Sequence, residues 1–177
     1  MGKKPIFLIG YMCSGKTTLG KALADSSNLD FIDLDDFIEQ KAGCSISEIF
    51  KRDGEGRFRE LEQESLHEVS DFQDCIISCG GGTPCFFDNM DHMNRSGLTV
   101  FLDADESTLI RRLLLYGADR PLVSGKSISE LQKFIEMQLA DRKQYYEKAA
   151  AIWNTDKLDN EKEIEENVIK FRNQFAI

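Results

Sequence analysis

The chain has 177 residues, 41% of them hydrophobic, and a formal net charge of −9 at pH 7. This length and composition suit a single globular domain, residues 1–177, with a core of its own. The acidic balance argues against nucleic acid or an anionic membrane as the main partner, because both bind basic surfaces. With no long apolar run, no early leader segment and five cysteines without a CxxC pair, we expect a cytoplasmic protein.

Apolar runs alternate with helical patterns along the chain, which is typical of βαβ units and a parallel sheet. The predicted strands are residues 6–9, 31–34, 75–78, 99–102 and 151–154. The predicted helices are residues 16–26, 47–52, 55–70, 106–115, 129–150 and 161–174. Residues 116–129 carry glycine and serine and no sustained period. Their length predicts a lid over a site, although a merely irregular connection is the alternative.

A glycine-bearing segment links the first predicted strand to the first predicted helix. It contains Gly10 and, five residues later, Gly15-Lys16-Thr17, which is the P-loop pattern in its expected context. Such a loop points backbone N–H groups at phosphates beside a helix N-terminus. Lys16 can reach the β- and γ-phosphates, and the Thr17 hydroxyl can bind Mg²⁺. The sequence therefore predicts a protein that binds a nucleoside triphosphate.

Two acidic residues, Asp33 and Asp35, lie at the end of the second predicted strand. Residues at i and i+2 of a strand share a face, so both are expected to face the crevice at the carboxyl ends of the strands. One carboxylate can then hold Mg²⁺ while the other accepts from a substrate hydroxyl. The alternative is a helix N-terminus, where the helix dipole stabilises acidic side chains.

Three further patterns predict a site for an anionic acceptor. Arg59, with Glu62 on the same helix face, can bind a carboxylate, although a surface ion pair is the alternative. Glycines 80–82 follow the third strand and allow a ligand to lie against bare backbone, unless they serve only a turn. Arg120 can act from the lid on the transferring phosphoryl group, and Arg142 can supply a second cation.

In this order and at these distances, the P-loop, D-x-D, F-R-x-x-E, G-G-G, R-P-L and R-x-x-x-Y patterns resemble the shikimate kinase family, from about Ile6 to Tyr146. The resemblance implies an α/β P-loop kinase fold, a five-stranded parallel sheet of order 2-3-1-4-5 with helices on both faces and a mobile lid. It also implies phosphorylation of the 3-hydroxyl of shikimate by ATP, with Mg²⁺, in the pathway to chorismate and aromatic amino acids. The partners would be ATP and shikimate, and the chain would be a monomer.

The resemblance also implies roles for single residues. The residues that wrap the phosphates would be Cys13, Ser14, Gly15, Lys16, Thr17 and Thr18, with Thr17 on Mg²⁺ and Asp33 in its outer shell. The residues that bind shikimate would be Asp35, Arg59, Gly80, Gly81, Gly82 and Arg142, with both arginines on its carboxylate. The catalytic residues would be Lys16, Asp35 as general base, and Arg120. Arg112 would lie along the adenine.

The chain departs from the family pattern in two places. Cys13 stands where the family usually has glycine; beside a helix N-terminus and Lys16, its thiol is expected to be alkylated readily and protected by ATP. Residues 153–156 match the adenine-contacting segment only loosely. Two other functions stay open: a different small-metabolite kinase, such as a gluconate kinase, and a nucleotide-sensing module without catalysis.

Overall fold

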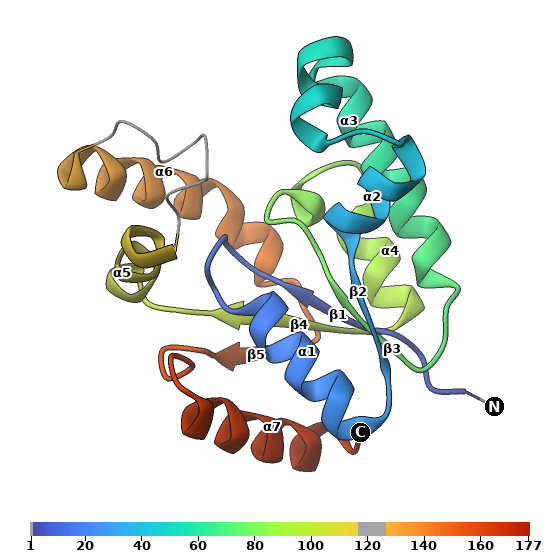
Figure 1. Cartoon of the computed structure of the whole chain (residues 1–177), viewed down its shortest axis with the longest axis vertical. Helices are drawn as coiled ribbons and strands as arrows, with labels where there is room; N and C mark the ends of the chain where they lie inside the picture. The colour runs from blue at the N-terminus through green and yellow to red at the C-terminus, as the bar shows by residue number, and fades with distance from the viewer. Residues whose placement is uncertain (1, 117–126) are drawn as a thin grey trace.

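The computed structural model describes residues 2–116 and 127–177 and contains one parallel sheet (Figure 1). In chain order the strands are β1 (Ile6–Ile9), β2 (Asp30–Asp33), β3 (Cys75–Ser78), β4 (Leu98–Asp103) and β5 (Ala151–Asn154). They lie in the order β2-β3-β1-β4-β5, and all neighbours are parallel. The predicted fold and strand order are therefore confirmed, and the carboxyl ends of all five strands lie at one edge.

Helices cover both faces of this sheet (Figure 1). They are α1 (Lys16–Ser27), α2 (Leu34–Ala42), α3 (Ile46–Ser70), α4 (Asn89–Ser96), α5 (Glu106–Tyr116), α6 (Ile128–Tyr146) and α7 (Glu161–Phe175), with a short 3-10 turn η1 (Thr83–Cys85). Side chains of α1 and α7 pack on one face against Leu8 and Val100. The helices from α2 to α6 pack on the other face against Phe7 and Phe101. Because both faces are covered, β1 and β3 are buried along their whole length, as strands of a parallel sheet are expected to be.

The largest difference from the prediction lies after β2. The strand ends at Asp33, and α2 begins at the next residue, with the Asp33 side chain accepting from the Asp35 backbone N–H. Asp35 therefore lies in the first turn of a helix, so the inference from a shared strand face was wrong. The alternative, acidic residues at a helix N-terminus, describes the local structure, but both carboxylates line the cavity at the carboxyl ends of the strands, as expected. The helix was missed because it follows the strand with no intervening turn residues.

Other boundaries differ in ways that have physical causes. The two helices predicted on either side of Gly54 are one element, α3, kinked where Gly54 has φ 80° and ψ 175°. α6 begins one residue after Ser127, which forms a capping box with Glu130. It ends at Tyr146 rather than at residue 150, because Ala150 N–H donates to Thr99 Oγ1 and leads the chain into β5. The eight residues of α4 were not predicted.

The predicted lid, residues 116–129, lies only partly within the described residues. Its first residue belongs to α5 and its last residues to the start of α6. Residues 117–126, and with them Arg120, lie outside the described residues. No described helix is both long and apolar enough to span a membrane.

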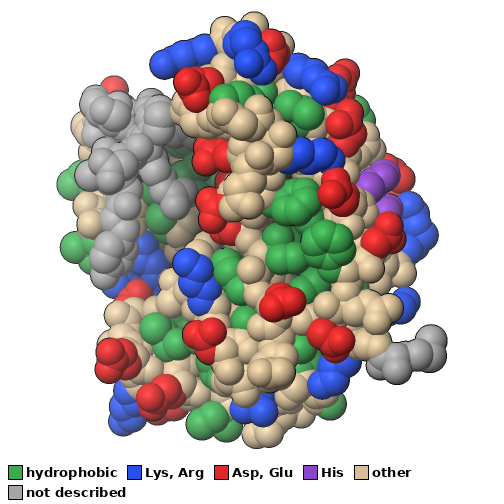
Figure 2. All heavy atoms as spheres, turned by 45° about the vertical axis from the view of Figure 1, so that its right-hand side comes forward, with side chains coloured by type: hydrophobic (Ala, Val, Ile, Leu, Met, Phe, Trp, Pro, Cys, Tyr) green, Lys and Arg blue, Asp and Glu red, His purple; other side chains and the backbone are tan. Residues whose placement is uncertain are grey.

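The face formed by α2, α3 and α4 carries acidic and basic side chains in alternation (Figure 2). Ion pairs on these helices join Lys41 to Glu68, at 2.5 Å, and Arg57 to Glu60, at 2.8 Å. On this face the positive charges are therefore interspersed with negative ones, whereas a nucleic-acid-binding surface gathers basic residues.

Candidate active site

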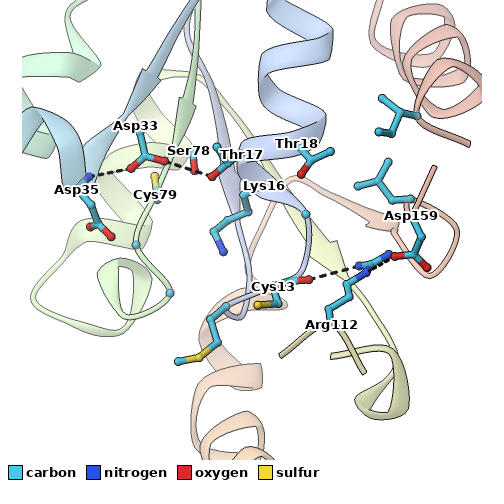
Figure 3. A pocket seen from close by; sticks show the side chains of 16 residues that line it. Cys13, Lys16, Thr17, Thr18, Asp33, Asp35, Ser78, Cys79, Arg112 and Asp159 are labelled. Atoms are coloured by element: carbon cyan, nitrogen blue, oxygen red, sulfur yellow. Dashed lines mark hydrogen bonds and ion pairs between the residues drawn. The ribbon is translucent and has the colours of Figure 1, made fainter. Parts of the chain in front are cut away.

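A cavity of about 490 Å³ lies at the carboxyl ends of the strands (Figure 3). Its walls come from the loop between β1 and α1, the end of β2, the segment after β3, α5, and the start of α7. The predicted site residues that line it are Cys13, Gly15, Lys16, Thr17, Thr18, Asp33, Asp35, Gly80, Gly81 and Arg112. Residues predicted from distant parts of the sequence thus meet in one cavity.

The loop from Gly10 to Gly15 has a conformation that its glycines allow. Gly10 and Gly15 have φ angles of 141° and 94°, and a Cβ on Gly10 would lie 2.6 Å from the carbonyl oxygen of Leu102. Lys16 Nζ donates to the carbonyl oxygens of Gly10 and Tyr11, at 2.9 and 2.8 Å. The lysine thereby closes the loop and places its ammonium group in the cavity, where phosphate groups can bind it.

Thr17 and Asp33, which both line this cavity, bring two oxygen atoms together. Thr17 Oγ1 donates to Asp33 Oδ2 at 3.3 Å, while Asp33 Oδ1 accepts from the Asp35 backbone N–H at 3.1 Å. A hydroxyl and a carboxylate are the hard oxygen ligands that Mg²⁺ prefers. The residues present therefore fit a magnesium ion.

Asp35 is a half-buried carboxyl group beside other carboxylates. Burial, and after it the negative charges of Asp33 and Glu62, together raise its pKa to about 6, although the positive charge of Lys16 opposes the shift. A Cβ on Gly80 would lie only 3.1 Å from Asp35 Oδ1, so the carboxyl lies against bare backbone. A carboxylate with a pKa near neutrality can accept a proton from a hydroxyl group.

Arg59 and Glu62 form a partly buried ion pair on α3. Arg59 Nη1 donates to Glu62 Oε2 at 2.8 Å, and Glu62 is 1% exposed. The other oxygen of Glu62 accepts from Thr83 Oγ1 at 2.6 Å. The predicted pair is therefore present, and the burial of Glu62 excludes the alternative of an ordinary surface contact. Gly82 lies beside it, because a Cβ there would be 2.8 Å from Arg59 Nη1.

Arg142, on α6, lies beside the same glycine turn. Its Cζ lies 5.7 Å from the centroid of the Tyr11 ring, and a Cβ on Gly81 would be 3.4 Å from its Nη1. Tyr146, one turn further along α6, donates its hydroxyl to the Gly81 carbonyl oxygen at 2.5 Å. Burial raises the pKa of this hydroxyl, so the donor stays protonated and ties α6 to the glycine turn.

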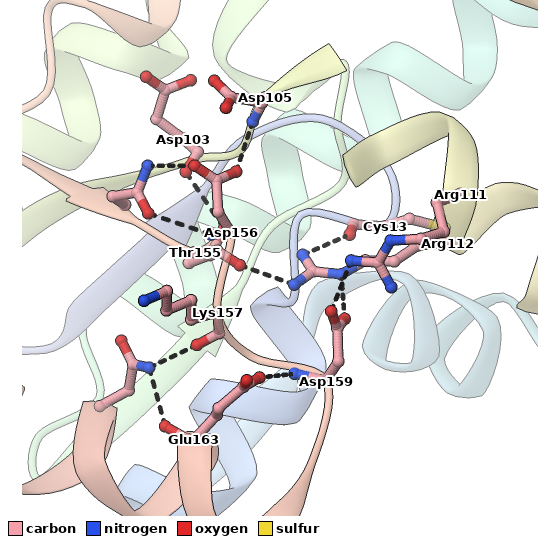
Figure 4. A network of polar contacts seen from close by, with 12 residues as sticks. Cys13, Asp103, Asp105, Arg111, Arg112, Thr155, Asp156, Lys157, Asp159 and Glu163 are labelled. Atoms are coloured by element: carbon pink, nitrogen blue, oxygen red, sulfur yellow. Dashed lines mark hydrogen bonds and ion pairs between the residues drawn. The ribbon is translucent and has the colours of Figure 1, made fainter. Parts of the chain in front are cut away.

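Arg112 is held by contacts that the sequence did not predict (Figure 4). Its Nε donates to Asp159 Oδ1 and its Nη2 to the Thr155 carbonyl oxygen, both at 2.7 Å. Its Nη1 donates to the Cys13 carbonyl oxygen at 3.4 Å. The side chain is 6% exposed, so its position is fixed. Asp159 lies 47 residues away in an acidic stretch without a motif, and no local signal marks it as a partner.

Shikimate kinases are found by the family model, among the curated relatives and among the solved structures. The family model described as shikimate kinase matches residues 12–173. A shikimate kinase of Phocaeicola vulgatus is 49% identical over 167 residues, 94% of this chain and 95% of that protein. The crystal structure of shikimate kinase from Bacteroides thetaiotaomicron has a TM-score of 0.95 at 45% identity, covering 98% of this chain and 99% of that one.

A more distant structure carries a ligand. Shikimate kinase from Acinetobacter baumannii, solved in complex with shikimate, has a TM-score of 0.84 at 26% identity, covering 98% of this chain and 94% of that one. Because the family model and the relatives span nearly the whole chain, the resemblance seen in the sequence motifs is confirmed. The chain belongs to the shikimate kinase family.

Proposed function

We propose that this chain transfers the γ-phosphoryl group of ATP to the 3-hydroxyl of shikimate, giving shikimate 3-phosphate and ADP. The reaction would serve the pathway to chorismate and aromatic amino acids. Membership of the shikimate kinase family supports the proposal, and so does the similar fold of a family member solved with shikimate. The observation that carries it is the glycine turn after β3, where the three residues predicted to hold the acceptor converge.

Each glycine of that turn lies against a different acceptor-site side chain. A Cβ on Gly80, Gly81 or Gly82 would meet Asp35, Arg142 or Arg59, at 3.1, 3.4 and 2.8 Å respectively. Two guanidinium groups and one carboxylate around bare backbone suit a small acid that also carries hydroxyl groups. The arginines would bind the carboxylate of shikimate, and Asp35 would accept from a hydroxyl.

The nucleotide would bind on the other side of Lys16. Backbone N–H groups of Cys13 to Thr18 would wrap the phosphates, with Lys16 on the β- and γ-phosphates. Arg112 would lie along the adenine, and its fixation by Asp159 and Thr155 supports this role. Arg120, which lies outside the described residues, is proposed as a lid cation over the phosphates.

Thr17 and Asp33 would hold Mg²⁺, Thr17 directly and Asp33 in the outer shell. The ion, when bound, neutralises negative charge on the phosphates. The chain's own residues then act on the acceptor. Asp35 takes the proton of the 3-hydroxyl while the hydroxyl oxygen forms a bond to the γ-phosphorus. The bond from that phosphorus to the β,γ-bridging oxygen breaks, and ADP leaves.

Lys16 and Asp35 would contribute in different ways. Lys16 offsets the negative charge of the phosphates, which is typically worth a factor of roughly 10²–10³ in rate for one such contact. Asp35 fixes the hydroxyl in line for attack and receives its proton. We also propose that the chain is a monomer. We propose a reducing cytoplasm as its compartment, which the five free thiols support.

The test is release of ADP from ATP and Mg²⁺ in a coupled assay, with shikimate, with gluconate and with no acceptor. Of the three conditions, we expect strong ADP release only with shikimate. The Arg59→Ala variant should lose this activity, chiefly through a higher KM for shikimate. A signal with gluconate, or ATP binding without any turnover, would overturn the proposal in favour of another metabolite kinase or a nucleotide-sensing module. Normal kcat/KM in Arg59→Ala would refute the role of Arg59.

A further inference from the structure

The guanidinium group of Arg59 already has a neighbour at each hydrogen-bonding edge. Nε and Nη2 donate to Glu55 Oε1 at 3.3 and 3.1 Å, and Nη1 donates to Glu62 Oε2 at 2.8 Å. The outer end faces Gly82, where a Cβ would lie 2.8 Å from Nη1 and 3.0 Å from Nη2. An incoming carboxylate must therefore replace one of these neighbours.

The three neighbours differ in how firmly they are held. Glu62 is 1% exposed and is fixed by Thr83 Oγ1 at 2.6 Å. Gly82 presents backbone, which belongs to the turn after β3. Glu55, in contrast, is 58% exposed and contacts Arg59 through one oxygen. Glu55 is the neighbour that can leave at the lowest energetic cost, because a half-exposed ion pair contributes little.

Two aromatic rings keep the guanidinium group in place when one neighbour leaves. The Arg59 Cζ lies 4.0 Å from the centroid of the Phe86 ring and 5.0 Å from that of Phe58. Phe58 is buried, and Phe86 is half-buried. Stacking on these rings, together with Glu62, orients the Nε and Nη2 edge toward the position that Glu55 vacates.

We propose that Glu55 is an internal competitor for the carboxylate of the acceptor: it occupies the Nε and Nη2 edge of Arg59 in the free enzyme and is displaced when shikimate binds. The inference rests on the proposed function, since shikimate supplies the incoming carboxylate. Glu55 would lower the affinity of Arg59 for shikimate and, by a similar factor, for other small carboxylates that bind at this edge. It is a residue that sets the affinity for the acceptor by acting through Arg59.

The experiment compares the wild type with Glu55→Gln and Glu55→Ala. Glu60→Gln is the matched control, because Glu60 is also 58% exposed but pairs with Arg57. Binding of shikimate is measured by calorimetry without nucleotide, and KM and kcat are measured with ATP. We expect the Kd and KM for shikimate to fall by about two- to fivefold in both Glu55 variants, the range for a half-exposed ion pair. The effect should fall on KM rather than kcat, and acetate should inhibit both variants at lower concentrations than the wild type.

The outcomes separate this inference from the proposed function. An equal or higher Kd in both Glu55 variants, with normal shikimate binding by the wild type, would overturn the inference and make Glu55 a support of Arg59. A fall of the same size in Glu60→Gln would also overturn it, because a general loss of negative charge would then explain the effect. A wild type that neither binds nor phosphorylates shikimate would instead refute the proposed function.

Discussion

Replacing Asp35 with asparagine should abolish turnover and, at the same time, stabilise the fold. The pKa of Asp35 is raised from 3.8 to about 6, first by burial and then by the charges of Asp33 and Glu62. A shift of about two pKa units corresponds to at most ~3 kcal/mol, taking roughly 1.36 kcal/mol per unit. Because the side chain is only half-buried, we discount this to about 1–2 kcal/mol.

The sign of the pH dependence follows from proton binding. Between about pH 4 and pH 6 the folded protein holds the Asp35 proton more tightly than the unfolded chain does. The wild type therefore loses stability as the pH rises through this window, and the loss is complete above about pH 6. The advantage of Asp35→Asn should be full at pH 7 and absent at pH 4. At pH 7 it should raise the Tm by about 2–8 °C.

The assay is urea unfolding followed by the fluorescence of Trp153, the one tryptophan of the chain, which packs against Phe171 and Phe175. Asp36→Asn is the control, because Asp36 is exposed in the same helical turn and should change stability by less than about 0.5 kcal/mol. An Asp35→Asn variant that is no more stable than the wild type at pH 7 would refute the reasoning. A gain that persists at pH 4 would do so as well.

Three other substitutions test separate parts of the site. Gly82→Ala places a Cβ 2.8 Å from Arg59 Nη1. Initial rates should then show a KM for shikimate that is roughly tenfold higher or more, with the KM for ATP unchanged. An unchanged KM for shikimate would contradict the role of this contact. Asp159→Asn removes the charged partner of Arg112, and the KM for ATP should rise about five- to tenfold while that for shikimate stays constant. Cys13→Gly relieves a φ of 61° and should add up to about 1 kcal/mol to the free energy of unfolding, so a loss of stability in urea would contradict it. Iodoacetamide should label the wild type at Cys13, more slowly with ATP.

The sequence predicts the sheet well because each strand carries its own signal. β1, β3 and β5 have the predicted limits, since short apolar runs in a parallel sheet are bounded by loops with distinct residue types. The P-loop was equally predictable, because its residue types are dictated by a ligand rather than by packing. The residues on α3 and in the glycine turn that we propose to hold the acceptor could be found for the same reason.

Contacts between distant segments could not be predicted in this way. Arg112 and Asp159 are brought together only by the packing of α5 beside the turn that follows β5, and an acidic stretch alone does not indicate which carboxylate is used. The pairing of Arg59 with Glu55 was visible as an i,i+4 spacing, but that spacing is common on charged helices. This pair differs from others with the same spacing because Gly82 and Phe86 close the other sides of the Arg59 guanidinium group.

Glu62 shows why the two halves of the acceptor site form one unit. Its carboxylate fixes Arg59, and its negative charge also raises the pKa of Asp35. The same buried charge thus holds Arg59, the cation proposed to bind the acceptor, and contributes to the raised pKa of Asp35, the proposed base. Removing the charge of Glu62 would loosen Arg59 and lower the pKa of Asp35 together. If the proposed roles hold, the F-R-x-x-E pattern therefore couples the binding of the acceptor to the acceptance of its proton.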